Sequence, residues 1–94
     1  MTTMFARHKV EDYKNWKRVY DEIGNVRKEN GVTAAHVYRD TADPDTIIVT
    51  HQFNSKDDAT RFANSEDLKS AMHKAGVQGQ PEFWFGENLE STPF

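Results

Sequence analysis

The chain of 94 residues contains no cysteine, and this absence excludes several chemistries at once. Disulfide bonds, thiolate zinc sites and a cysteine nucleophile are all ruled out. A chain without cysteine suits a reducing compartment, and we expect a cytoplasmic protein. No apolar run approaches the roughly 20 residues of a membrane span, and the first residues lack a signal-peptide run. We therefore expect no membrane partner.

Several motifs of catalysis are also missing. The 5 glycines are dispersed, so no glycine-rich loop is available to hold a phosphate. No serine lies in a Gly-x-Ser-x-Gly turn. The four histidines are 28, 15 and 22 residues apart and include no i, i+4 pair of the kind that helical metal sites use. The spacing therefore predicts no metal site.

Hydrophobic residues are scarce, at 36% of the chain, whereas charged residues reach 29%. The 12 basic residues are scattered among 15 acidic ones, and the net charge is −3. This distribution argues against a nucleic-acid partner and against a polybasic membrane anchor. A core this lean is only marginally stable by itself, which favours burial of further surface against a second copy.

Two patterns fill the first half of the chain. Residues 4–10 alternate apolar and polar side chains, as a half-buried strand does. From Asp12, a credible N-cap, apolar residues recur at helical spacing up to Asn30 and Gly31, a pair that ends helices. The apolar stripe of this helix contains Tyr13, Trp16, Val19, Tyr20, Ile23, Val26 and Arg27.

The second half repeats the order. Residues 32–39 and 46–53 are predicted strands, and the short turn between them predicts an antiparallel hairpin. A helical stripe begins after Ser55, loses phase near Asn64, and restarts after a second capping signal at Ser65. We therefore predict a second helix that is interrupted near Asn64. A loop at 77–81 and a strand at 82–89 follow.

The order β-α-β-β-α-β predicts an α+β chain with the ferredoxin-like fold, a four-stranded antiparallel sheet with two helices on one face. We expect one domain over residues 1–94, with residues 4–90 structured and 91–94 as a tail. The uncovered sheet face would carry Phe5, Ile48 and either Trp84 or Phe85. Covering about 600 Å² of apolar surface contributes some 15 kcal/mol before association costs. The sequence therefore predicts a homodimer through the sheet face.

Two of the four histidines share a strand face with apolar residues. His8 is in phase with Met4, Ala6 and Val10, and His51 with Ile47, Val49 and Phe53. In this topology the first and third strands are neighbours, so the two imidazoles are candidates for one shared pocket or for proton transfer. Each is equally open to a simpler interpretation as a hydrogen-bonded core or interface residue. For His36 we favour a structural role, and for His73 a capping one.

At this point the chain resembles a family, the dimeric α+β-barrel proteins related to antibiotic-biosynthesis monooxygenases and small polyketide cyclases. The likeness rests on a strand-to-helix segment, residues 7–17, and on residues 62–72, which precede a Gly-Val pair, a proline and an aromatic last strand. It spans roughly residues 4–90. The most similar members are short bacterial proteins described as cyclases or monooxygenases. The resemblance implies a dimeric α+β barrel.

The resemblance also implies a site. Members that act on polyketide-like aromatics hold the substrate in an apolar cavity between sheet and helices, without metal or flavin, and we accordingly expect no cofactor. Haem-degrading members use an asparagine on the first strand and a tryptophan on the third, and this chain has neither. The implied residues are His8 and His51 as catalytic groups and Trp16, Tyr20, Phe62 and Met72 as substrate-binding groups.

Two classes of function follow. The first is a cofactor-independent cyclase, isomerase or monooxygenase that acts on a small aromatic or enolisable substrate, with His8 or His51 as general base. The second is a non-catalytic dimeric protein that binds a small molecule or serves as an accessory subunit. For Trp16 and Tyr20, core packing competes with pocket lining. A cavity of roughly 300 Å³ that meets an imidazole would favour the first class or a binder, and a closed core the structural role.

Overall fold

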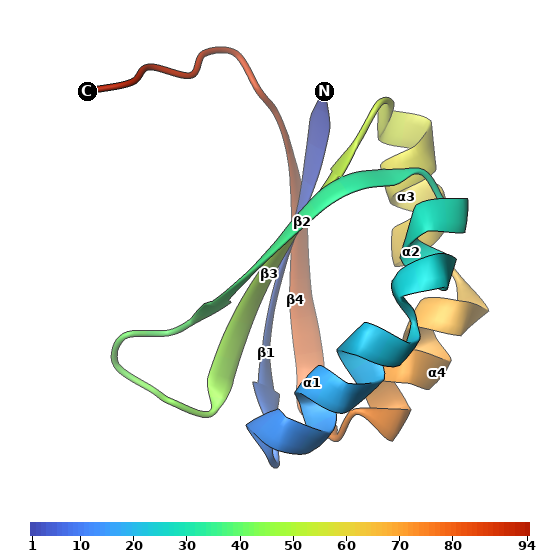
Figure 1. Cartoon of the computed structure of the whole chain (residues 1–94), viewed down its shortest axis with the longest axis vertical. Helices are drawn as coiled ribbons and strands as arrows, with labels where there is room; N and C mark the ends of the chain where they lie inside the picture. Colours follow the sequence, from blue (N-terminus) through green and yellow to red (C-terminus); the bar gives the residue numbers. More distant parts are fainter.

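The computed structural model describes residues 1–94, which form four strands and four helices around one sheet (Figure 1). The chain begins with a strand and ends with an extended segment that leaves the body of the molecule after Glu87. The elements in chain order are β1 (Thr2–Val10), α1 (Tyr13–Glu22), α2 (Gly24–Glu29), β2 (Val32–Arg39), β3 (Thr46–Phe53), α3 (Lys56–Ala63), α4 (Glu66–Lys74) and β4 (Val77–Glu87).

The sheet has the strand order β2-β3-β1-β4, and every neighbouring pair is antiparallel. All four helices cover the same face of the sheet (Figure 1). This arrangement confirms the predicted ferredoxin-like α+β fold. β2 and β3 have the predicted bounds, and β1 begins two residues earlier than predicted. No helix is long and apolar enough to cross a membrane.

The last strand differs from the prediction, because residues 77–81 belong to β4 and not to a loop. The pairing of β1 with β4 shifts its register between Arg7 and Lys9, so that the extra residues of β4 bulge opposite His8. Gly79 has a φ of +67° at this bulge. β4 is an edge strand, where the missing N–H of Pro81 costs no ladder hydrogen bond. Glycine and proline thus mark a bulge here and not the end of a strand.

The first helix also differs, because the predicted single helix is divided at Ile23. Ile23 has φ −94° and ψ 17°, and it precedes Gly24, so two weak helix formers stand in succession. Backbone hydrogen bonds still cross the break, from Ile23 N–H to the Val19 carbonyl and from Arg27 N–H to the Ile23 carbonyl, each 3.1 Å long. The chain therefore bends between α1 and α2 without leaving the helical layer.

The break in the second helix lies where the sequence predicts it. α3 ends at Ala63, and α4 begins at Glu66. Between them Ser65 donates its hydroxyl to the Phe62 carbonyl at 2.8 Å and accepts the Leu68 N–H at 3.2 Å. One side chain thus satisfies the last turn of α3 and the first turn of α4, which joins the two helices at a fixed angle.

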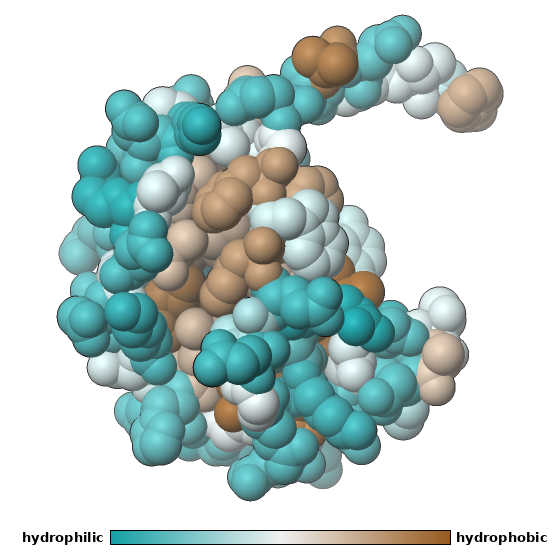
Figure 2. Space-filling model, turned by 180° about the vertical axis from the view of Figure 1, so that it is seen from behind, coloured by the Kyte–Doolittle hydropathy of each residue, from teal (hydrophilic) through white to brown (hydrophobic).

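The core lies between the sheet and the helices. Alternate residues of β1 and β3 point toward the helices, which makes Met4, Val49 and Phe53 almost wholly inaccessible to solvent. The buried residues form two apolar clusters, one under α1 and one under α3. Figure 2 shows the molecule from behind, with apolar side chains gathered between the helical layer and the β4 edge.

We expect Ser65→Ala to lower the free energy of unfolding by about 1 kcal/mol, because the Leu68 N–H and the Phe62 carbonyl both lose their side-chain partner. Urea unfolding followed by circular dichroism measures the loss. The control is Ser70→Ala, an exposed position within α4 where alanine should be neutral or slightly stabilising. Equal stabilities for the two variants would contradict the capping role of Ser65.

Candidate functional site

An apolar cavity of about 50 Å³ lies between the sheet and the helices. Its wall includes residues from β1, β3 and β4 on one side and from α1, α2, α3 and α4 on the other. All the residues that the sequence implicates line it: His8, Trp16, Tyr20, His51, Phe62 and Met72. Arg27 and Phe83, which are not among the residues that the sequence implicates, line the cavity too.

His8 lies on the helix-covered face of β1, opposite the bulge in β4. Trp16, in the first turn of α1, donates its indole N–H to His8 Nε2 at 2.9 Å. A nitrogen that accepts a hydrogen bond carries no proton in the neutral ring, so the proton of His8 resides on Nδ1. His8 Nδ1 is buried and has no partner. His8 therefore presents an unused N–H donor, and its lone pair is occupied by Trp16.

His51 lies on the same face, on β3, with its ring tilted against Phe62 at 5.4 Å between centroids. It makes no hydrogen bond, and its Nδ1 is buried without a partner. Burial lowers the pKa of His51 to about 4, and the nearby positive charge of Arg27 acts in the same direction. Burial alone lowers the pKa of His8 to about 4. Both imidazoles are therefore neutral at pH 7.

The two imidazoles are at different ends of the cavity. His51 pairs with Met4 across the strands, whereas His8 pairs with Ile47. His8 is four positions after Met4 in β1, which is roughly 13 Å along the strand. The two rings are therefore too far apart to exchange a proton directly. They can act together only on a ligand that extends from one to the other.

Aromatic rings of α1 form one wall of the cavity. Trp16 stacks on Tyr20 with 5.1 Å between centroids and 16° between planes. Trp16 is only 4% exposed and belongs to the core cluster under α1, so it packs in the core and lines the cavity as well. Core packing and pocket lining, the two roles that the sequence left open for Trp16, therefore both apply. Tyr20, half-buried, presents its ring to Arg27.

Arg27 is the only charged side chain in the cavity wall. Its guanidinium carbon lies 3.7 Å from the centre of the Tyr20 ring, and its Nη1 donates to the Tyr20 carbonyl at 2.6 Å. The sequence does contain a signal for this position, because Arg27 continues the helical stripe of Trp16, Tyr20 and Ile23. A charged residue on an otherwise apolar stripe is the signal in the sequence that marks Arg27 as a candidate site residue.

The remaining histidines lie outside the cavity. His36 is on the uncovered face of β2, where it stacks near Tyr38 at 6.3 Å between centroids. His73 is exposed in the last turn of α4. No three histidine, aspartate or glutamate side chains gather closely enough to hold a metal ion.

Comparisons with known proteins identify a family and support the fold. The sequence model of a family described as antibiotic biosynthesis monooxygenase matches residues 5–74. A search of curated proteins finds no match. The similar solved structures include SnoaB, described as a cofactor-independent oxygenase from Streptomyces nogalater, with a TM-score of 0.79 and 10% identity over 99% of this chain and 97% of that one.

Two further structures illustrate how widely the fold is distributed. A candidate antibiotic biosynthesis monooxygenase from Caulobacter crescentus has a TM-score of 0.75 and 17% identity over 95% of this chain and 90% of that one. A conserved protein from Methanosarcina mazei has a TM-score of 0.72 and 14% identity over 90% of this chain and 89% of that one. At these identities the likeness establishes the fold alone.

The buried imidazoles make stability depend on pH in a defined direction. In the unfolded chain each binds a proton near pH 6.5, whereas in the folded chain the pKa of each is about 4. Stability is therefore lost as the pH falls from 6.5 toward 4. We expect each histidine to cost about 2 kcal/mol at pH 5 relative to pH 7.5.

Urea unfolding at the two pH values measures this loss, at one fixed protein concentration. His51→Gln should remove about half of the pH-dependent loss, and His73→Gln should remove none of it. A pH dependence that is unchanged in His51→Gln would show that His51 is not held neutral by burial.

Proposed function

The chain belongs to the antibiotic biosynthesis monooxygenase family, and we propose that it is a small enzyme that acts without a cofactor on a small aromatic or enolisable substrate. The observation that carries the proposal is a pair of neutral imidazoles in an apolar cavity, each with an unpartnered nitrogen. A buried polar atom without a partner costs about 1–3 kcal/mol, so its retention requires an explanation. A ligand that supplies hydrogen-bond partners to these nitrogens would explain why they are retained.

The two histidines have different roles in this proposal. His51 is the general base, because neither of its nitrogens is engaged by the protein. His8 is a hydrogen-bond donor through Nδ1–H, because Trp16 occupies its other nitrogen. The first step is then transfer of a proton from an enol or phenol O–H, or from an acidic C–H, to His51. The products of this step are a substrate anion and an imidazolium, and His8 donates to a second oxygen of the substrate.

The low pKa of His51 determines when this transfer is favourable. A base with a pKa of about 4 is fully available at pH 7 but accepts a proton weakly. The anion formed beside it stabilises the imidazolium, since opposite charges attract strongly where water is excluded. Proton transfer therefore depends on the substrate lying in contact with the ring, which also confines the chemistry to bound substrate.

The size of the cavity favours a second candidate function. At about 50 Å³ it is smaller than the roughly 150 Å³ that takes up a benzene ring, and far below the volume typical of ligand sites. So small a cavity is what a non-catalytic accessory protein with a packed core would have, whereas a binding protein, like the enzyme, needs a larger site. In the enzyme, substrate entry requires the helical layer to open. α2 is the element suited to move, because none of its residues is buried.

We further propose a homodimer that forms through the uncovered sheet face. Phe5 and Trp84 stack there with 5.6 Å between centroids, and Trp84 remains 44% exposed. Tyr38 on the same face is 52% exposed. Arg7, flanked by Asp40 and Glu82, supplies a partly exposed ion pair beside these rings. An aromatic surface with a polar border is typical of interfaces between subunits.

Trp84→Glu tests this dimer. Sedimentation at micromolar concentration should give the wild type twice the monomer mass of 10.8 kDa, and the variant should shift toward the monomer because it buries a charge in the interface. Ser70→Glu places the same charge on an exposed position of α4 and should leave the dimer intact. A wild type that sediments as a monomer would exclude the sheet-face dimer.

His51→Gln tests the enzymatic role. A thermal-shift screen of aromatic acids and quinols identifies a ligand, since 100 times the Kd stabilises the protein by about 2.7 kcal/mol. With a ligand that is turned over, we expect His51→Gln to reduce the rate by about 10²- to 10⁴-fold. His36→Gln, on the opposite sheet face, is the control and should keep the wild-type rate. Undiminished turnover in folded His51→Gln would favour the accessory function.

A further inference from the structure

Arg27 is a cation without an anionic partner at the cavity wall. No ion pair in the chain involves it. Its side chain is half-buried, and the other titratable residues of the wall are His8, His51 and Tyr20, none of which supplies a negative charge in the neutral state. A positive charge in an apolar setting is costly unless it is paired or meets a ligand of opposite charge.

The bend between α1 and α2 places Arg27 beside the last turns of α1. Tyr20, in α1, precedes the break at Ile23 by three residues. Arg27 Nη1 donates to the Tyr20 carbonyl at 2.6 Å, and the guanidinium carbon lies over the Tyr20 ring, 3.7 Å from its centroid. A guanidinium has five N–H donors, of which one is used here. The remaining donors have no protein acceptor while α2 is in this position.

Arg27 and His51 line the same cavity. Burial lowers the pKa of His51, and the positive charge of Arg27 lowers it further. A ligand oxygen that gives its proton to a base beside this guanidinium becomes an anion next to a cation. Guanidinium groups bind such oxygens with charge-assisted hydrogen bonds, which are about twice as strong as neutral ones.

We propose that the cavity binds its aromatic ligand as an oxygen anion, an ionised phenol or enol, whose charge is paired with the guanidinium of Arg27. The inference rests on the proposed function for the location of the ligand, but it requires no turnover. It assigns to Arg27 the selection of acidic ligands over neutral ligands of the same shape. When the ligand binds already ionised at oxygen, His51 stays neutral and is free to accept a proton from an acidic C–H of the same ligand.

4-Nitrophenol is a suitable probe, because its absorbance distinguishes the phenol from the phenolate. Its neutral counterpart is 4-nitrotoluene, which has nearly the same shape and no acidic proton. With the wild type, we expect the titration midpoint of bound 4-nitrophenol to lie about 1 to 2 pH units below that of the free compound. This absorbance measurement uses the unmodified protein, and an unshifted midpoint would overturn the inference.

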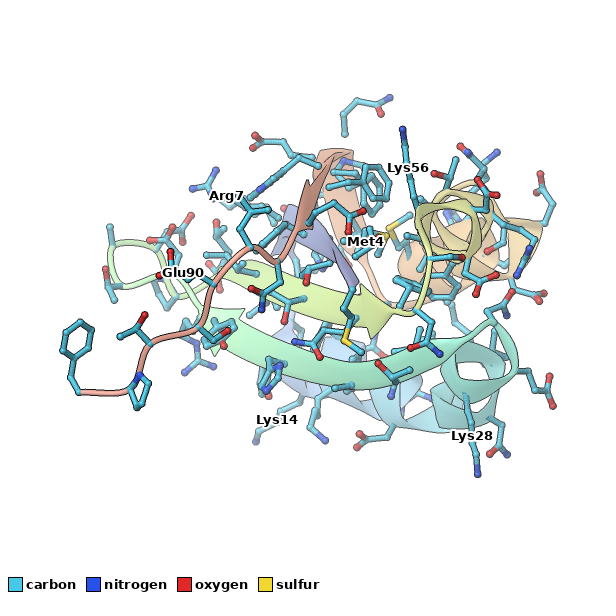
Figure 3. The ribbon with its side chains drawn as sticks, turned by 90° about the horizontal axis from the view of Figure 1, so that it is seen from above. Met4, Arg7, Lys14, Lys28, Lys56 and Glu90 are labelled. Carbon is cyan, nitrogen blue, oxygen red and sulfur yellow. The ribbon has the colours of Figure 1, made fainter.

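Three variants test whether the charge that pairs with the bound phenolate belongs to Arg27. Calorimetric titration near pH 7 should show Arg27→Gln binding 4-nitrophenol about 10- to 100-fold more weakly, with binding of 4-nitrotoluene little changed. Arg27→Lys keeps the charge and should retain most of the affinity. Lys28→Gln is the matched control, because Lys28 is on the same helix, carries the same charge and points away from the sheet into solvent (Figure 3). It should bind both probes as the wild type does.

The outcomes separate this inference from the proposed function. If both probes bind and Arg27→Gln weakens neither of them, the pairing with Arg27 is wrong, whereas the cavity remains a ligand site. If neither probe binds, the inference fails together with the proposed cavity. If 4-nitrophenol binds as the phenolate but His51→Gln does not slow turnover of a substrate, the proposed base is wrong and the role of Arg27 stands.

Discussion

The register between β1 and β3 is the constraint on which the rest of the molecule depends. Met4 pairs with His51 and His8 with Ile47, so both imidazoles point toward the helices. The side chains of a strand alternate with a period of two, and a slip of one residue would turn every one of them to the other face. The same register turns Phe5 and Trp84 to the uncovered face, where they stack. One pairing pattern thus determines the cavity and the exposed aromatic surface together.

The chain tolerates polar groups without partners at the cavity. The Nδ1 atoms of His8 and His51 are buried without partners, and Arg27 lies at the same cavity without a counter-ion. No other buried side-chain nitrogen or oxygen lacks a partner, and Ser55 and Ser65 cap their helices. Unsatisfied polar groups that gather in one cavity are typical of a site that awaits a ligand. The missing hydrogen-bond and charge partners lower the stability of the folded chain, and the same missing partners allow a ligand to bind.

Much of the fold could be predicted because it follows from local patterns. The alternation of residues 4–10 and 46–53, the hairpin turn and the second capping signal at Ser65 each depend on neighbours within a few positions. The errors arose where tertiary packing overrides such patterns. Residues 77–81 form part of β4 because β1 supplies a partner for an irregular edge strand, and the helix bends at Ile23, where Arg27 donates across the bend to the Tyr20 carbonyl.

The sequence by itself determined the order of the strands and helical segments and the faces of the strands, since these follow from periodicity and capping, and its resemblance to a family pointed to six of the residues at the cavity. Only the tertiary structure decided what those residues can do. His8 is a donor and not a base because the indole of Trp16, eight residues along the chain, occupies its Nε2. His51 is free and Arg27 unpaired because no other element brings them a partner. Protonation and hydrogen bonding depend on distances of a few ångströms between separate elements, and only the packed chain sets those distances.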